Sequence, residues 1–339
     1  MNEIRPLLSI IMVNYRSGKW IADSIQSLLH LNPGLACEII IVDNNASAGE
    51  KTELLQKFPS LRYFEMKQNS GFARANNQGM RLASGNVFLL LNPDTLSIDN
   101  SIKQCYERLQ TDRFVAAGVQ QLNADHTPQI SGNFFVKGGL NHLLPIPYWG
   151  DFIRWMGYRT QQKVPNIPEA TTTVNVDWIS GAFLMVKRSA VEDAGMMDED
   201  FFLYAEEVEW CNRLKREGDL CIYGDLHIIH LEGAAINSDR KIVEKGYYNL
   251  YDKKGLQLMV SNHLRVRKQY GVVWFIFLLL NYSWGFFVFL AASTLHRLFT
   301  LRNPFGDWSR VFAFGGNLMR LWSLAPTIIR GKAHFYKMF

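Results

Sequence analysis

The chain has 339 residues, 48% of them hydrophobic and 20% charged, so it can bury a sizeable core and global disorder is excluded. The net charge of +5 is unevenly distributed: residues 265–339 carry ten Lys and Arg against one acid, Asp307, which gives +9 there and leaves −4 for residues 1–264. The four cysteines are scattered without a C-x-x-C pair, so the sequence predicts neither a zinc site nor a disulfide framework.

The first third of the chain alternates short apolar runs with amphipathic stretches. We expect strands at 8–14, 38–43, 61–66 and 87–91, and helices at 20–29, 53–58 and 73–83. Runs of Ile and Val joined by helices predict βαβ units, and therefore an α/β fold with a mostly parallel sheet buried on both faces. The first apolar run is too short for a signal peptide and lacks a cleavage site, so we expect the bulk of the protein in the cytoplasm.

Polar residues follow each of these predicted strands, at Asn14, Asp43, Asn69 and Asn92. The carboxyl ends of parallel strands meet at one edge of a sheet, where ligands bind in open α/β folds. A cleft for a polar ligand is therefore predicted at that edge.

Two of the strand ends carry groups suited to a nucleotide. Asp43 could accept hydrogen bonds from a base or a ribose, or it could be an ordinary turn aspartate. Gly71 would let the backbone approach a phosphate and Arg74 could pair with it, while Asn77 could bind the nucleotide or hold its loop. No Walker lysine motif and no G-x-G-x-x-G occurs, so an ATPase or a hydride-transfer enzyme is not supported.

Asp94 and His230 are candidate metal ligands. A single Asp after a buried strand can hold Mg²⁺ or Mn²⁺, although an Asn-Pro-Asp-Thr turn with a helix cap is the alternative. His230 could complete the metal shell or contact a phosphate, and His227 competes for that role. Between these residues the sequence predicts an irregular insertion or flap over the cleft at 120–175, a strand at 178–186 and a strand pair at 220–229.

Residues 269–295 carry no formal charge, and the run is long enough to cross a bilayer. Basic residues flank it on both sides, and a second apolar stretch, 311–329, is broken by Arg320 and Pro326, so a re-entrant or in-plane helical pair fits better than a single span. The apolar neighbours of the basic residues favour anionic lipid over nucleic acid as the partner. A buried helical hairpin of a soluble domain is the alternative. We expect a globular domain at 1–264 and a basic, apolar, membrane-associated helical region at 265–339.

Three carboxylates, Glu206, Glu207 and Glu209, open a predicted helix after an aromatic run. Acids are stabilising at a helix N-terminus, and that is the simpler explanation. A carboxylate there could also act as a general base in a pocket walled by four aromatic residues, Phe201, Phe202, Tyr204 and Trp210.

The first half contains the motifs Val13-Asn14-Tyr15, Ile41-Val42-Asp43-Asn44, Asn69-x-Gly71-Phe72-Ala73-x-x-Asn76-Asn77 and Leu90-Leu91-Asn92-Pro93-Asp94-Thr95. The second half contains Gly181-Ala182-Phe183, Phe201–Glu209, His230-x-x-Gly233 and Arg265–Gly271. As an ordered set over residues 7–271, they resemble the family 2 glycosyltransferases, especially their bacterial rhamnosyltransferase-like branch.

The resemblance implies a GT-A fold and an inverting sugar transfer from a nucleotide-diphosphate donor, with a divalent metal, Mg²⁺ or Mn²⁺, as cofactor. It assigns the nucleotide-sugar site to Asn14, Asp43, Asn69, Gly71, Arg74, Asn77 and Asn92. It assigns the acceptor side to Trp178, Gly181, Ala182 and Tyr204, and the metal to Asp94 and His230. Glu207 would be the catalytic base.

Two departures from the family pattern keep alternatives open. Asn92 stands in place of the first Asp of Asp-x-Asp, which leaves a thinner metal shell. Glu207 stands where the family usually has Asp, so Glu206 remains a rival for the base.

The resemblance implies a lipid-linked or surface-glycan acceptor, as in O-antigen or other cell-envelope polysaccharide synthesis, with rhamnose as a possible donor sugar. The enzyme would work at the cytoplasmic face of the inner membrane, without nucleic acid. A sugar nucleotidyltransferase and a non-catalytic, membrane-attached binding module are the alternatives. The sequence predicts no oligomeric state.

Overall fold

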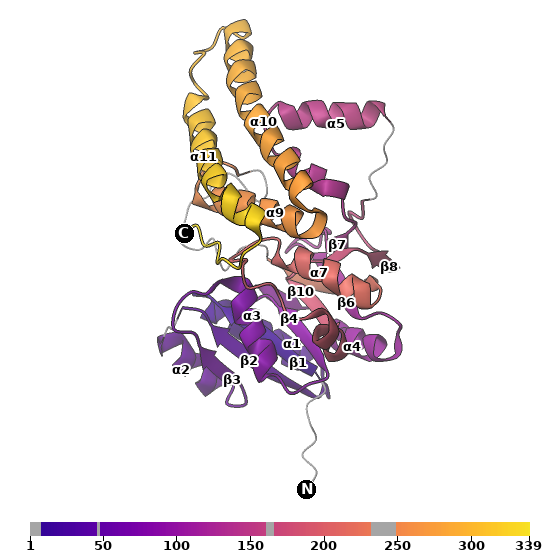
Figure 1. The fold of residues 1–339 in the computed structure, drawn as a ribbon. Coiled ribbons are helices and arrows are strands. Elements are labelled where there is room, and N and C mark those ends of the chain that lie inside the picture. The colour runs from indigo at the N-terminus through magenta and orange to yellow at the C-terminus, as the bar shows by residue number, and fades with distance from the viewer. Residues whose placement is uncertain (1–7, 46–47, 161–165, 232–248) are drawn as a thin grey trace. The chain divides into compact units, whose positions relative to one another are not determined.

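A computed structural model describes residues 8–45, 48–160, 166–231 and 249–339 (Figure 1). The chain forms two compact units. The first, which we call the sheet unit, comprises Met1–Phe134, Asn166–Glu199 and Glu207–Lys241. The second, the helical unit, comprises Phe135–Pro165, Asp200–Glu206 and Ile242–Phe339.

The first four strands of the sheet unit are parallel, in the order β3-β2-β1-β4. They are β1 (Leu8–Asn14), β2 (Cys37–Asp43), β3 (Arg62–Glu65) and β4 (Val87–Leu91), and they are connected by α1 (Gly18–Leu31), α2 (Ala48–Lys57) and α3 (Gly71–Leu82). Residues of β1 alternate between two buried clusters: Ile10 and Met12 pack with α1, whereas Ile11 packs with α3. The βαβ units and the sheet buried on both faces, as predicted from the sequence, are confirmed.

The remaining strands make the sheet mixed. β10 (Phe183–Lys187) runs antiparallel between β4 and β6 (Ala116–Leu122), and β11 (Leu220–His230) runs parallel to β6. β5 (Thr95–Ser97) and β8 (Thr173–Val176) pair antiparallel with β11. A separate two-stranded sheet joins β7 (Gly132–Asn133) to β9 (Trp178–Ile179). The helices of this part are α4 (Ser101–Thr111), α6 (Arg188–Ala194) and α7 (Glu206–Glu217).

Two strand predictions need correction. The strand expected at 178–186 is divided into β9 and β10 by a turn at Gly181, because the two parts pair with different partners. The strand pair expected at 220–229 is one long strand, β11, whose register shifts between Tyr223 and His227.

The helical unit contains η1 (Lys137–Leu143), α5 (Trp149–Arg159), α9 (Lys253–Tyr270), α10 (Val272–Phe299) and α11 (Trp308–Arg330). α10 and α11 form an antiparallel hairpin, in which the indole N–H groups of Trp308 and Trp322 donate to Thr294 and Ser283. Among the described residues, α10 alone is long and apolar enough to cross a membrane, with a mean hydropathy of 1.9. The predicted boundary at 264 falls inside α9, and the division into a catalytic and a membrane-associated region stays a prediction, as does the flap at 120–175.

Candidate active site

The carboxyl ends of β1 and β2 carry buried polar side chains that are joined to each other. The carboxylate of Asp43 accepts hydrogen bonds from the Tyr63 hydroxyl at 2.7 Å and the Asn45 backbone at 2.9 Å. Burial, and then the bond to Asp43, raise the pKa of Tyr63. The Asn14 amide donates to Glu50 at 2.8 Å and accepts from the Ser17 backbone at 2.9 Å. The cluster therefore holds the carboxyl ends of these two strands rigidly.

The turn from β3 into α3 is tied to the end of β2 by Asn44. Its side chain accepts from the Ser70 backbone at 2.8 Å and donates to Asn69 at 3.1 Å and to the Gly71 carbonyl at 3.2 Å. Gly71 has φ +81°, a left-handed conformation that favours glycine, and it starts α3 with its N–H bonded to Asn69. The sequence reading did not assign a role to Asn44, although its position after Asp43 was the available signal.

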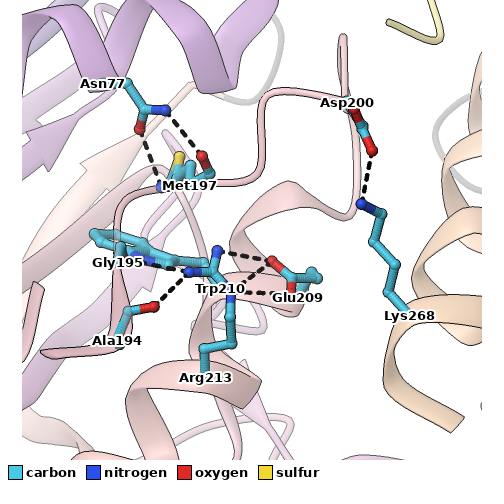
Figure 2. A network of polar contacts seen from close by, with 9 residues as sticks. All are labelled: Asn77, Ala194, Gly195, Met197, Asp200, Glu209, Trp210, Arg213 and Lys268. Atoms are coloured by element: carbon cyan, nitrogen blue, oxygen red, sulfur yellow. Dashed lines mark hydrogen bonds and ion pairs between the residues drawn. The ribbon is translucent and has the colours of Figure 1, made fainter. Parts of the chain in front are cut away.

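Asn77 and Arg74 on α3 hold the segment that precedes α7. The Asn77 amide exchanges two hydrogen bonds with the backbone of Met197, at 2.8 and 3.0 Å (Figure 2). It also donates to the Glu199 carboxylate at 3.0 Å. Arg74 donates to the Glu199 carbonyl at 3.1 Å. These contacts support the loop-holding role for Asn77, and the expected nucleotide contact of both residues stays a prediction.

Asp94 and His230 lie together, as the metal prediction requires. Asp94 is 4% exposed, and its Oδ1 is 3.6 Å from Nε2 of His230. β11 also pairs with the segment after Asp94, since the Leu231 N–H donates to the Asp94 carbonyl at 2.9 Å. His227 is three residues earlier on β11, so its side chain points to the opposite face and does not compete. Gly233, part of the family motif, lies outside the described residues.

Gln129 fixes the tautomer of His230. The Gln129 Nε2 donates to the His230 carbonyl and to Asn123 Oδ1, both at 2.7 Å, which defines the orientation of the amide. Its Oε1, 3.0 Å from His230 Nδ1, must then accept from Nδ1–H. Nδ1 is thereby occupied, and Nε2 is the ring nitrogen that faces the Asp94 carboxylate, as in a pair of ligands that share a cation. The described residues contain no group of three His, Cys, Asp or Glu side chains arranged around a metal position.

The turn between β9 and β10 connects the end of β4 with α7. The Asn92 N–H donates to the Ala182 carbonyl at 3.0 Å. A Cβ placed on Gly181 would lie 3.6 Å from the Phe72 ring and 3.7 Å from Cβ of Glu207. Trp178, on β9, is partly buried and pairs with Asn133. Gly181 and Glu207 are thus neighbours, and Ala182 is bonded to the end of β4.

α7 begins at Glu206, as predicted, but its three acids differ in their surroundings. Glu209 is held bidentately by Arg213, which also donates to the carbonyls of Ala194 and Gly195 (Figure 2). Glu206 is 3% exposed, and Glu207 is partly exposed beside Gly181. Glu209 therefore has a structural role, as one of the two explanations for these acids requires.

The predicted aromatic wall around the carboxylates is wrong for Trp210. This side chain is fully buried in the core of the sheet unit, where its indole N–H donates to the Gly195 carbonyl at 2.8 Å. In the helical unit, Phe202 packs edge-on against Phe335 and Phe339. These aromatic residues belong to packed cores.

The entry to α7 has two consecutive non-glycine residues in the left-handed region, Tyr204 at φ +73° and Ala205 at φ +67°. Such conformations are costly and concentrate at functional sites. Burial, with the charges of Glu206 and Asp252, raises the pKa of Tyr204 to about 12, so its hydroxyl stays protonated at neutral pH. The residue types gave no signal for this backbone geometry.

Solved structures of other proteins resemble this fold. The structure of a mannosyltransferase from Pyrobaculum calidifontis, in complex with GDP-Man and Mn²⁺, superposes on this chain with a TM-score of 0.52 at 14% identity. The superposition covers 96% of this chain and 88% of the mannosyltransferase chain. A GalNAc-T7 structure with UDP, GalNAc and Mn²⁺ superposes with a TM-score of 0.50 over 68% of this chain and 45% of its own, also at 14% identity. At these identities the likeness concerns the fold, which is that of the GT-A class.

Comparison of the sequence with known proteins points to one family. Residues 9–163 match the family described as "Glycosyl transferase family 2". A hexosyltransferase of low-salt glycan biosynthesis from Haloferax volcanii is 29% identical over 62% of this chain, and the match spans 62% of that relative. An N-acetylglucosaminyl-diphospho-decaprenol L-rhamnosyltransferase from Mycobacterium tuberculosis is 25% identical over 64% of this chain and 73% of its own. These matches, which span just under half of the chain for the family and about two thirds of it for the relatives, agree with the family that the sequence motifs indicated.

Proposed function

We propose that the protein is an inverting glycosyltransferase that moves a sugar from a nucleotide-diphosphate donor to a lipid-linked or surface-glycan acceptor. The observation that supports this most directly is the set of contacts at the carboxyl end of β4. There Asn92 is bonded to Ala182, Gly181 lies beside Glu207, and Asp94 follows Asn92 by two residues. A candidate metal pair and a candidate base thus come from one edge of the sheet.

Asp94 and His230 would hold the divalent cation. The carboxylate and the bare imidazole nitrogen, 3.6 Å apart, form a donor set suited to Mn²⁺ or Mg²⁺. Bound there, the cation would offset negative charge on the leaving diphosphate. The buried cluster of Asp43, Asn14 and Asn69 would form the nucleoside side of the donor site, with the Gly71 turn next to it.

Glu207 would accept the proton of the acceptor hydroxyl. The oxygen then forms a bond to the anomeric carbon of the donor while the bond from that carbon to the diphosphate oxygen breaks. Attack from the opposite face inverts the configuration, and no covalent enzyme intermediate is needed. Glu207 is preferred to Glu206 because it is the more exposed of the two and lies beside the Gly181 turn.

The names of the relatives support a substrate class. The mycobacterial relative is named for rhamnose transfer to a lipid-diphosphate sugar, so we favour rhamnose as donor sugar and a polyprenyl-diphosphate glycan as acceptor. Such an acceptor is confined to a bilayer, which agrees with membrane attachment through residues 265–339 at the cytoplasmic face of the inner membrane. An O-antigen biosynthesis protein of Myxococcus xanthus, 25% identical over 63% of this chain, supports a cell-envelope pathway.

A donor panel tests the proposal. Full-length protein with Mn²⁺ is given dTDP-rhamnose and UDP- and GDP-sugars, with a lipid-diphosphate sugar acceptor, and the product is identified by mass. Glu207→Gln should lower turnover about 10²–10⁴-fold while donor binding is retained, because only proton transfer is removed.

Glu217→Gln, at the exposed end of the same helix, is the matched control and should keep wild-type turnover. Full activity of Glu207→Gln together with an inactive Glu206→Gln would assign the base to Glu206. Formation of nucleoside triphosphate and sugar 1-phosphate from the panel when pyrophosphate is added would instead indicate a nucleotidyltransferase.

A further inference from the structure

One face of α10 is exposed and entirely apolar. Side chains at helical spacing along its length project away from the unit, from Val273 near the N-terminus to Leu298 near the C-terminus. The large members between them are Ile276, Phe277, Leu280, Trp284, Phe287 and Leu295. We call this face the α10 stripe. In water it would be an unusually large apolar patch.

The opposite side of α10 is covered in part by residues 137–149, which comprise η1, interrupted by the left-handed Gly138 and Gly139, and the segment that leads into α5. Gly138 lies against Trp274, and Tyr282 donates to the carbonyl of His142 at 2.8 Å. Farther along, Ile146 packs against Gly285, and the Tyr148 ring lies 6.4 Å from the ring of His296. From Trp274 to His296 this cover extends about 33 Å at the α-helical rise, which exceeds the hydrocarbon thickness of a bilayer.

This cover is incompatible with α10 as a lipid-surrounded span. α5 joins α10 near its middle through the Trp149–Trp284 ring contact at 6.4 Å, and in Figure 1 it extends crosswise from α10. If α10 crossed the bilayer, α5 would lie near the bilayer centre with the exposed charges of Asp151, Arg154 and Arg159. Exposed charged side chains and the unpaired backbone groups at the ends of a helix are too costly at that depth.

α5 itself has the composition of a helix at a membrane surface. Its rings stack in sequence, Trp149 on Phe152 at 5.3 Å and Phe152 on Trp155 at 5.8 Å, and the ladder continues the α10 stripe through Trp284. Phe152, Trp155 and neighbouring Met156 are each nearly half exposed. Arg159 lies over the Trp155 ring at 4.8 Å, so a cation accompanies the exposed aromatic residues.

The charges at the edge of these helices match an anionic surface. The exposed basic residues of α5 and of the chain after α10 are Arg154, Arg159, Arg302, Arg310, Arg320, Arg330, Lys332 and Lys337. The acids in α5 and from α10 to the C-terminus, Asp151 and Asp307, pair with Arg154 and Arg297 respectively. Basic residues beside an apolar face favour a bilayer with anionic headgroups over a protein partner.

We propose that α5 and the α10 stripe form one lipid-facing surface, and that both helices lie in the plane of an anionic bilayer, in a single leaflet. α10 then attaches the protein without crossing the membrane, and α5 sets its depth. The inference rests on the proposed membrane association of the helical unit and is independent of the sugar transfer.

Depth measurements on full-length protein test this directly. Nitroxide labels are placed by Leu280→Cys, Phe287→Cys and Leu295→Cys on α10, and by Phe152→Cys on α5. The background is Cys37→Ser, because the other three cysteines are buried. In vesicles of phosphatidylethanolamine and phosphatidylglycerol, all four labels should lie at similar shallow depth, about 5–10 Å into the headgroup boundary.

A label at Leu29→Cys, half exposed on α1 of the sheet unit, is the matched control and should stay in water. A crossing α10 would give a depth profile that changes by about 22 Å along the helix axis between positions 280 and 295, which would overturn the proposal. An aqueous label at position 152 with lipid-immersed labels on α10 would remove α5 from the surface.

Binding to vesicles gives a second, independent measurement. The double variant Phe152→Ser/Trp155→Ser should partition about tenfold more weakly than wild type, and Leu29→Ser should not change. Wild type should also bind about tenfold more weakly when phosphatidylglycerol is replaced by phosphatidylcholine. Unchanged partition of the double variant would refute the lipid-facing surface. The same conclusion would follow if, in the absence of vesicles, the protein were a dimer in which these labels are shielded from water.

Discussion

Gln129 should control metal affinity without touching the metal. Its side chain makes three hydrogen bonds, to His230 Nδ1 at 3.0 Å and to the His230 carbonyl and Asn123 at 2.7 Å. In Gln129→Leu the imidazole can rotate and exchange tautomers, so Nε2 is no longer held toward Asp94. Loss of such an outer hydrogen bond typically costs 10–100-fold in metal affinity, or about 1.4–2.7 kcal/mol.

The measurement is a titration of full-length protein with Mn²⁺, with free Mn²⁺ followed by its paramagnetic resonance signal at saturating nucleoside diphosphate. Gln110→Leu, an exposed glutamine on α4, is the control and should bind Mn²⁺ like wild type. Thermal unfolding without metal separates a loss of affinity from a loss of fold. If Gln129→Leu binds normally while His230→Ala does not, the orienting role is refuted; if both bind normally, His230 is not a ligand.

Three further predictions concern stability. Gly79→Ala places a Cβ 2.3 Å from Ile11 and should destabilise the protein by about 1–3 kcal/mol in urea unfolding. The control Gly49→Ala, whose Cβ has no atom within 4 Å, should be neutral or stabilising. Equal effects of the two variants would contradict the packing of α3 on β1. Arg213→Met leaves the buried Glu209 without its guanidinium partner and should lower the free energy of unfolding by about 3 kcal/mol. Adding Glu209→Gln should restore part of this stability. No restoration would mean that the bonds of Arg213 to the Ala194–Gly195 backbone dominate its contribution. The third prediction concerns Glu38: burial would raise its pKa, but hydrogen bonds from Ser84, Ser9 and Arg62 outweigh this effect and lower the pKa from 4.5 to about 2. The free energy of unfolding should therefore fall as the pH drops through the range between these two values. Glu38→Gln should remove that part of the acid sensitivity.

The first four strands could be predicted from the sequence because their pattern is local. Residues 39–42 and 87–91 are unbroken apolar runs, and a strand buried on both faces requires such a run. The helices between them carry their own apolar period. Their order in the sheet does not follow from this local pattern, because β4 pairs with β1 and not with β3, which precedes it in the chain.

The strands after residue 115 could not be placed in this way, because partners distant in sequence determine them. β10 lies antiparallel between β4 and β6, and β11 combines two apolar runs across a register shift at Tyr223. The apolar pattern of 220–229 is the same for a strand pair and for one bent strand. Only the pairing with β6, β8 and β5 distinguishes them.

The residues of the candidate site also divide into those that the sequence could identify and those that it could not. Asp94 and His230 could be named because a carboxylate and an imidazole are distinctive types at strand ends, and the structure brings them within 3.6 Å. For Asn77 the sequence left two roles open, and it gave Gln129 none, because an amide can bind a ligand, a backbone or another side chain equally well. Asn77 bonds to Met197, and Gln129 bonds to His230 from 101 residues away.

The acids of α7 show why a motif does not by itself identify a base. Glu206, Glu207 and Glu209 are chemically equivalent in the sequence, and each would stabilise the start of a helix. Helical geometry puts Glu209 four residues before Arg213, so its charge is used to hold the Ala194–Gly195 segment. Glu206 follows the strained Tyr204–Ala205 turn and is buried, whereas Glu207 is partly exposed and lies beside Gly181, where a Cβ would fit at van der Waals distance but a larger side chain would meet Phe72 and Glu207. Filling that space by Gly181→Leu should therefore impair transfer while donor binding and Mn²⁺ affinity persist. Unimpaired transfer in that variant would mean that the acceptor does not pass beside Glu207.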